Sequence, residues 1–165
     1  MPAFLRKVHK NRWSRESAPW IGQGDTQADA MTDLETRDNR LSVWRVDDEP
    51  GLEEVIAAMA ANCDYLSVFD YVLFGQDAIC QIGIKIESSL GSSGDQRINR
   101  ESHHDLIELT AGKLAVLAGK GTPARRPKKE VLNLVNDAVR SGRIDEAALK
   151  ENVRAEIRRG CTPGQ

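Results

Sequence analysis

The sequence has few of the features that assign a chain to a functional class directly. It contains three cysteines in 165 residues, Cys63, Cys80 and Cys161, with no CxxC pair and no combined Cys/His pattern. An odd number of scattered cysteines argues against a disulfide framework and against a structural zinc site, and it is typical of reduced thiols in the cytosol. We therefore expect no metal ion.

Long apolar runs are missing as well. No stretch approaches the roughly 18 apolar residues of a membrane span, and the opening "MPAFLRKVHKNRW" has no apolar core of a secretory signal. The sequence also has no P-loop, no GxGxxG and no HExxH motif, so we expect no cofactor. We predict a cytoplasmic protein that makes no contact with membranes.

Aromatic residues make up 5% of the chain, so its core must consist mainly of Leu, Val, Ile and Ala. The hydrophobic content of 40% and the charged content of 29% are ordinary for a soluble globular protein. A chain of this length buries enough apolar surface to fold without disulfides or metal ions.

Charge is strongly segregated along the chain, although the net charge is only −2. Residues 1–15 hold five basic and no acidic residues, residues 16–119 have a net charge of −12, and residues 120–165 have a net charge of +5. This pattern indicates either self-complementary assembly or separate surfaces for different partners. The alternative is that the basic ends fold back onto the acidic middle of the same chain.

Periodicity indicates a small α+β domain with a few short strands. Residues 41–46 are rich in β-branched and aromatic residues and predict a strand, and residues 80–87 alternate as a half-buried strand does. Residues 48–62 carry a full helical stripe with Pro50 in the first turn. The stripe consists of Leu52, Val55, Ile56, Met59 and Ala60, and we expect it to pack either on the strand over 41–46 or on the apolar residues of the strand over 80–87.

We predict three regions: a basic N-terminal arm over residues 1–20, an acidic α+β body over 21–119, and a basic linker with a helical hairpin over 120–165. The hairpin has two narrow apolar faces, and it cannot enclose a core alone. The missing surface is either the acidic body or another protein, and we favour another protein. The predicted interaction residues are Arg125, Arg126, Lys128, Lys129, Leu149, Val153 and Ile157.

The segment "ESHHDLIE" concentrates groups that could carry chemistry. Ser102 at a helix N-cap would place Asp105 three residues later, close to a capping box, and would begin a helix that runs to Ala118. The adjacent His103 and His104 would diverge by about 100° on that helix and would not chelate one ion. We interpret the segment as a helix start, and we keep an acid–base role of His103, His104 and Asp105 as an alternative.

Three aspartates, Asp25, Asp29 and Asp33, recur at four-residue spacing. On a helix they would form one carboxylate face, which suits a hard cation, a basic partner or simply solvent. The sequence leaves these alternatives open, and we favour the solvated face.

The function predicted from the sequence is a non-enzymatic protein–protein interaction module: an adaptor, an immunity-type protein or an assembly subunit of a larger cytosolic complex. The partner would be another protein or a second copy. A first alternative is a nucleic-acid-associated accessory protein that uses the basic arm and linker. A second alternative is a small hydrolase or transferase that uses His103, His104 and Asp105.

Overall fold

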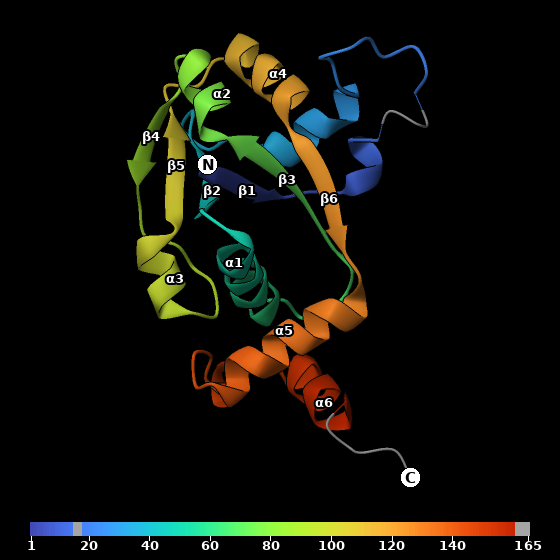
Figure 1. Ribbon diagram of the computed structural model, residues 1–165, viewed down its shortest axis with the longest axis vertical. Coiled ribbons are helices and arrows are strands. Elements are labelled where there is room, and N and C mark those ends of the chain that lie inside the picture. Colours follow the sequence, from blue (N-terminus) through green and yellow to red (C-terminus); the bar gives the residue numbers. More distant parts are fainter. Residues whose placement is uncertain (15–17, 161–165) are drawn as a thin grey trace.

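The computed structural model describes residues 1–14 and 18–160 (Figure 1). Its centre is a six-stranded antiparallel sheet in the order β4-β5-β2-β1-β3-β6. The strands are β1 (Ala3–Lys7), β2 (Leu41–Val46), β3 (Phe69–Gly75), β4 (Lys85–Ser88), β5 (His103–Ile107) and β6 (Thr122–Arg126). Helices cover this sheet, and the predicted α+β class is confirmed.

Six α-helices and three short 3-10 helices are present in the described part of the chain. The α-helices are α1 (Glu49–Ala61), α2 (Gln76–Gln81), α3 (Gln96–Glu101), α4 (Ala111–Lys120), α5 (Lys128–Arg140) and α6 (Glu151–Gly160). The 3-10 helices are η1 (Lys10–Arg12), η2 (Ala28–Leu34) and η3 (Glu146–Ala148).

One face of the sheet, called the α1 face below, packs against α1, and α5 and α6 extend the same core beyond α1 (Figure 1). Asp48 caps α1 by accepting a hydrogen bond from the Gly51 N–H at 2.8 Å. The helix buries its predicted stripe against strand residues, and the buried residues include Leu5, Trp44, Val46, Leu52, Val55, Ile56, Phe69 and Tyr71. The predicted strand over 41–46, the predicted helix and their contact are confirmed.

The opposite face, called the α4 face below, packs against η2, α2 and α4. Its core contains Phe4, Leu41, Val43, Val72, Phe74 and Leu106 from the strands, with Leu34, Ile79 and Leu117 from the covering segments. These segments are shorter than α1 and α5, and loop residues such as Trp13 help to close this face.

The predicted N-terminal arm is wrong for its first residues, because Ala3–Lys7 form β1 in the middle of the sheet. Phe4 and Leu5 enter the cores on opposite faces, and this burial outweighs the exposure preference of the neighbouring basic side chains. The strand lies between β2 and β3. Residues 15–17 of the predicted arm lie outside the described residues.

The predicted helix start at Ser102 is also wrong. Ser102 is the C-cap of α3, and His103–Ile107 form β5, which pairs with β2 and with β4. The next helix, α4, begins at Ala111, where the Thr110 hydroxyl accepts a hydrogen bond from the Lys113 N–H at 3.2 Å. Pairing with two neighbouring strands satisfies the backbone of "HHDLI", which the local pattern assigned to a helix.

Two further segments differ from the prediction. Residues 122–126, expected to be a linker, form β6, an edge strand that tolerates Pro123 because a single neighbour pairs with it. Residues 80–87, expected to be one strand, divide into the end of α2 and β4. Gly83 between them has a φ of +71°, which reverses the chain direction.

The C-terminal helical pair is present as α5 and α6, although its role differs from the prediction. Leu149, Val153 and Ile157 are 4%, 0% and 5% exposed, and they belong to the core of the α1 face. The third surface that the hairpin needs is therefore α1 of the same chain, so these three residues do not present an apolar surface to another protein. Residues 161–165, which complete the predicted hairpin region and include Cys161, lie outside the described residues.

Candidate functional site

The predicted acid–base residues lie next to one another on β5 and point to different sides of the sheet. His103 packs its ring against Trp44 at 4.7 Å between ring centroids, on the α1 face. His104 packs edge-on against Phe4 at 5.6 Å, on the α4 face. Because successive strand residues alternate between faces, the two imidazoles do not converge.

The hydrogen bonds of these residues hold the sheet and its loops together. The His103 ring nitrogen Nδ1 lies 2.9 Å from the Ser89 hydroxyl, and Asp105 accepts a hydrogen bond from the Ser42 hydroxyl at 3.0 Å. Burial lowers the pKa of His103 below its ordinary value, although the nearby Asp105 opposes this shift. The arrangement stabilises the fold, and it brings no nucleophile and base together in a cleft.

The predicted basic interaction residues are largely paired with carboxylates of the same chain. Arg125 donates two hydrogen bonds to Asp70, at 2.7 and 3.0 Å, and this contact lowers the pKa of Asp70 and raises that of Arg125. Arg126 pairs with Glu49. The remaining two are Lys128, which pairs with Glu156 at 2.8 Å, and Lys129, which is exposed.

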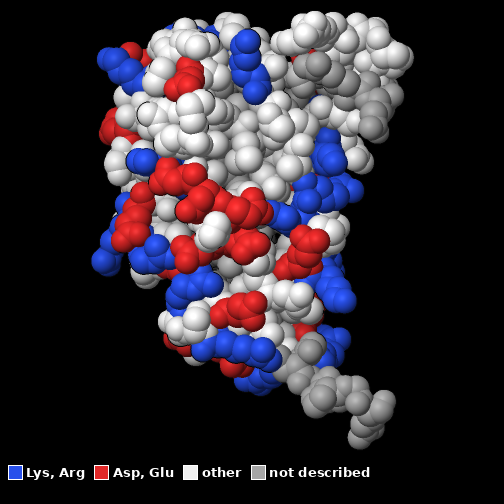
Figure 2. Space-filling view, viewed as in Figure 1, with Lys and Arg blue, Asp and Glu red and all other residues white. Residues whose placement is uncertain are grey.

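These ion pairs decide between the two interpretations of the segregated charge. Figure 2 shows a band of carboxylates across the middle of the molecule, over α1, with Lys and Arg side chains beside and below it. Arg126 and Arg143 reach into α1 from the C-terminal region, to Glu49 and Glu54, and Arg12 reaches Asp33 from the N-terminal region. The basic ends therefore fold back onto the acidic middle.

The three aspartates at four-residue spacing do not share a face. Asp33 is half-buried and accepts hydrogen bonds from Arg12 at 2.8 Å, from the Trp13 indole N–H at 2.9 Å and from the His9 backbone N–H at 3.0 Å. Asp25 and Asp29 instead line a shallow depression of about 320 Å³. Asp25 precedes η2, and within η2 the 3-10 geometry turns Asp29 away from Asp33, since 3.0 residues per turn do not align positions four apart.

Trp20 stands at the rim of this depression and is 80% exposed, whereas Trp13 and Trp44 are 4% and 7% exposed. Trp20, Asp25 and Asp29 thus line the same depression. We call these three residues the Trp20 surface. Trp20 was not among the predicted site residues. A tryptophan between Pro19 and a glycine-rich stretch, without helical or strand periodicity, is nevertheless a usable signal for an exposed aromatic residue.

The loop that carries Trp20 is held by the body of the protein. The Ile21 N–H donates to the Ala18 carbonyl at 3.0 Å, and Ala18 itself is buried. Further along the loop, Gly24 lies so close to Gly119 of α4 that a Cβ atom on Gly119 would come within 2.0 Å of the Gly24 carbonyl oxygen. These contacts fix the loop against α4.

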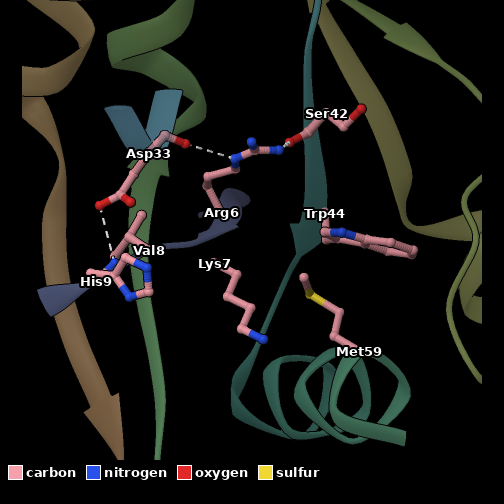
Figure 3. Close-up of a pocket in the computed structure, with 8 residues that line it drawn as sticks. All are labelled: Arg6, Lys7, Val8, His9, Asp33, Ser42, Trp44 and Met59. Carbon is pink, nitrogen blue, oxygen red and sulfur yellow. Dashed lines mark hydrogen bonds between the residues drawn. The ribbon is translucent and has the colours of Figure 1, made fainter. Parts of the chain in front are cut away.

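A second hollow, the β1–β2 crevice, opens where these two central strands separate (Figure 3). It has a volume of about 450 Å³. Its lining includes Arg6 and Lys7 of β1, Ser42 and Trp44 of β2, Asp33 of η2 and Met59 of α1. The sequence carries no local sign of this crevice, because its walls come from four segments that only the fold brings together.

In the part of the chain that the structure describes, no group of three or more His, Cys, Asp or Glu side chains is placed to hold a metal ion. Likewise, none of the described helices is long and apolar enough to cross a membrane. Comparison of the chain with protein-family models, with curated proteins and with solved structures finds no match.

Proposed function

We propose that this protein is a non-enzymatic interaction module that binds a partner protein through the Trp20 surface. The observation that carries the proposal is the 80% exposure of Trp20. Leaving a large apolar side chain in water forgoes roughly 1.5–3 kcal/mol of burial energy. Tryptophan is also among the residues that most often dominate the binding energy of protein interfaces.

The chemistry beside Trp20 points to a partner with a basic side chain. An arginine or lysine that stacks on the indole face would gain a cation–π contact. The same cation would meet the carboxylate of Asp29, which lines the adjacent depression. The anchored loop further supports binding, because a pre-ordered surface loses little conformational entropy when the partner arrives.

The alternatives have less support. A nucleic-acid surface at Arg125, Arg126, Lys128 and Lys129 would have to break three ion pairs with Asp70, Glu49 and Glu156. A hydrolase or transferase that uses His103, His104 and Asp105 would need side chains that converge, and the two histidines lie on opposite faces of the sheet. We keep a cytoplasmic location as part of the proposal, on the basis of the scattered cysteines.

Quantitative affinity capture tests the proposal. Tagged wild-type protein, Trp20→Ala and the matched control Tyr65→Ala are incubated with lysate of the source cells, and the retained proteins are compared by mass spectrometry. Tyr65 is 65% exposed and lies in a different loop. We expect a partner that wild type and Tyr65→Ala retain equally and that Trp20→Ala binds about thirtyfold more weakly in titrations with the purified partner.

The affinity capture with these three proteins can also contradict the proposal. If all three proteins retain the same set in the same amounts, the Trp20 surface is not the contact and the proposal fails. Circular dichroism of Trp20→Ala confirms that the loss of binding is not a loss of folding, because truncating a side chain that is 80% exposed leaves the core intact.

A further inference from the structure

The β1–β2 crevice exists because the central sheet lacks one pair of backbone contacts. The register of β1 and β2 runs from Ala3↔Val46 to Leu5↔Trp44, and its continuation would pair Lys7 with Ser42. That pair is not formed, although on their other edges β1 continues along β3 and β2 continues along β5. In an antiparallel strand, each residue directs its N–H and C=O groups to one side, and that side alternates from one residue to the next. Lys7 and Ser42 therefore direct their backbone groups into the crevice.

Arg6 occupies part of the missing contact. Its Nη1 donates to the Ser42 carbonyl at 3.0 Å, and its Nε donates to the Asp33 carbonyl at 3.1 Å. Figure 3 shows the guanidinium lying across the gap between these two residues. A guanidinium carries five N–H donors, and none of the hydrogen bonds within the described residues uses Nη2. Arg6 is therefore fixed in place and still has donors for a ligand.

The remaining walls combine a second positive charge with apolar surface. Trp44 is 7% exposed, and Met59 of α1 is partly buried next to it. The Lys7 ammonium lies 5.5 Å from the centre of the Phe69 ring and donates to the Cys63 sulfur at 3.4 Å, on the flexible side chain of a residue that lines the crevice. The volume of about 450 Å³ is typical of pockets that hold small molecules.

We propose that the β1–β2 crevice binds a small organic carboxylate. The carboxylate accepts hydrogen bonds from Arg6 and from the Lys7 backbone N–H, the Lys7 ammonium adds a second positive charge, and the apolar body of the ligand packs against Trp44 and Met59. This site is separate from the Trp20 surface and does not rest on the function proposed for it.

The surrounding charge favours a singly charged ligand. Asp33 lines the crevice, and both Asp33 and Glu35 act electrostatically on Arg6, so negative charge already lies near its cations. A phosphate dianion would meet stronger repulsion from these two groups than a carboxylate monoanion does. An apolar acid therefore fits the crevice better than a phosphate ester of the same size.

Amide-resolved NMR titration of the full chain tests this proposal with three probes: hydrocinnamate, the neutral hydrocinnamyl alcohol and phenyl phosphate. We expect hydrocinnamate, at concentrations up to about 10 mM, to shift the backbone amides of Lys7 and Ser42 and the indole N–H of Trp44. The alcohol should bind about tenfold more weakly, because it lacks the charge-assisted hydrogen bonds. Equal or tighter binding of the alcohol or of phenyl phosphate would overturn the proposal, and so would the absence of shifts at these three residues.

Variants locate the binding site. Lys7→Gln should weaken hydrocinnamate binding several-fold, whereas Lys129→Gln, an exposed lysine on α5, should leave it unchanged. Arg6→Lys keeps the charge but loses the planar fork, and it should weaken binding by about tenfold. If Arg6→Lys does not fold, the comparison of Lys7→Gln with Lys129→Gln and the binding of hydrocinnamyl alcohol test the proposal instead. Equal weakening of hydrocinnamate binding by Lys7→Gln and Lys129→Gln would count against the crevice.

Discussion

The two faces of the sheet are covered in different ways, and the difference shows where local sequence patterns are informative. The α1 face is covered by α1, on which α5 packs with α6, and α1 and α5 have 13 residues each. The α4 face is covered by the 3-10 helix η2, by α2 with six residues and by α4 with ten. The periodicity of a long amphipathic helix indicates which of its sides is buried. Short segments lack this period, and polar hydrogen bonds and close backbone contacts hold them on the sheet instead.

The largest expected effect concerns the α1 face and tests whether α6 belongs to the core. Val153→Asp places an unpaired carboxylate at a position that is 0% exposed, and it should lower the free energy of unfolding by about 4 kcal/mol or more. The matched control is Val116→Asp on α4, which is 51% exposed and should change stability by about 0.5 kcal/mol at most. Urea denaturation measures both. A similar, small effect of the two substitutions would show that α6 does not pack on the body.

The second prediction concerns the polar anchor of the α4 face. Asp33→Asn removes the charge that binds Arg12, the Trp13 indole and the His9 N–H, and it should cost about 2 kcal/mol. Asp29→Asn, on the same 3-10 helix but exposed, is the control and should be nearly neutral. Thermal unfolding distinguishes them. Equal melting temperatures for the two variants would mean that this anchor does not stabilise the α4 face.

The third prediction compares two glycines of α4. A Cβ atom at Gly119 would collide with the Gly24 carbonyl at 2.0 Å, so Gly119→Ala should destabilise the protein by about 1–2 kcal/mol and displace the loop that carries Trp20. Gly112→Ala meets nothing closer than 3.9 Å, and it should raise stability by up to about 1 kcal/mol through helix propensity. Chemical denaturation measures the change in the free energy of unfolding for each substitution, and the two changes should have opposite signs. Stabilisation by both substitutions would show that the Gly24–Gly119 contact is not maintained.

The smallest effect is a pH dependence that comes from His103. Burial lowers its pKa in the folded protein below the unfolded value of about 6.5, so the unfolded chain binds more protons between the two values. Stability therefore falls as the pH drops through about 6.5 toward the folded pKa, and this residue contributes no dependence above that window. Denaturation midpoints of wild type and His103→Gln at several pH values measure this difference. A wild-type slope that persists in the variant would assign the dependence to other groups.

The sequence determined the elements whose signals are local. The strand over 41–46, the helix capped by Asp48 and the amphipathic helix α5 follow from side-chain periodicity and capping, which require only neighbouring residues. Even the helical pair at the C-terminus is predictable in this way. Its burial against α1 is not, because an amphipathic helix shows that one side is buried and does not identify what buries it.

The tertiary structure alone decided β1, β5, β6 and both candidate sites. A strand is stabilised by its partners, and Ser42 of β2 meets Asp105 of β5 across more than sixty intervening residues. Such pairing made strands of a basic N-terminal segment and of a segment with two histidines, against their local patterns. The β1–β2 crevice depends on a backbone pair that fails to form between Lys7 and Ser42, and the Trp20 surface depends on a loop held by Gly119. Contacts between residues distant in the chain leave no local period in the sequence, and for that reason only the folded structure shows these sites.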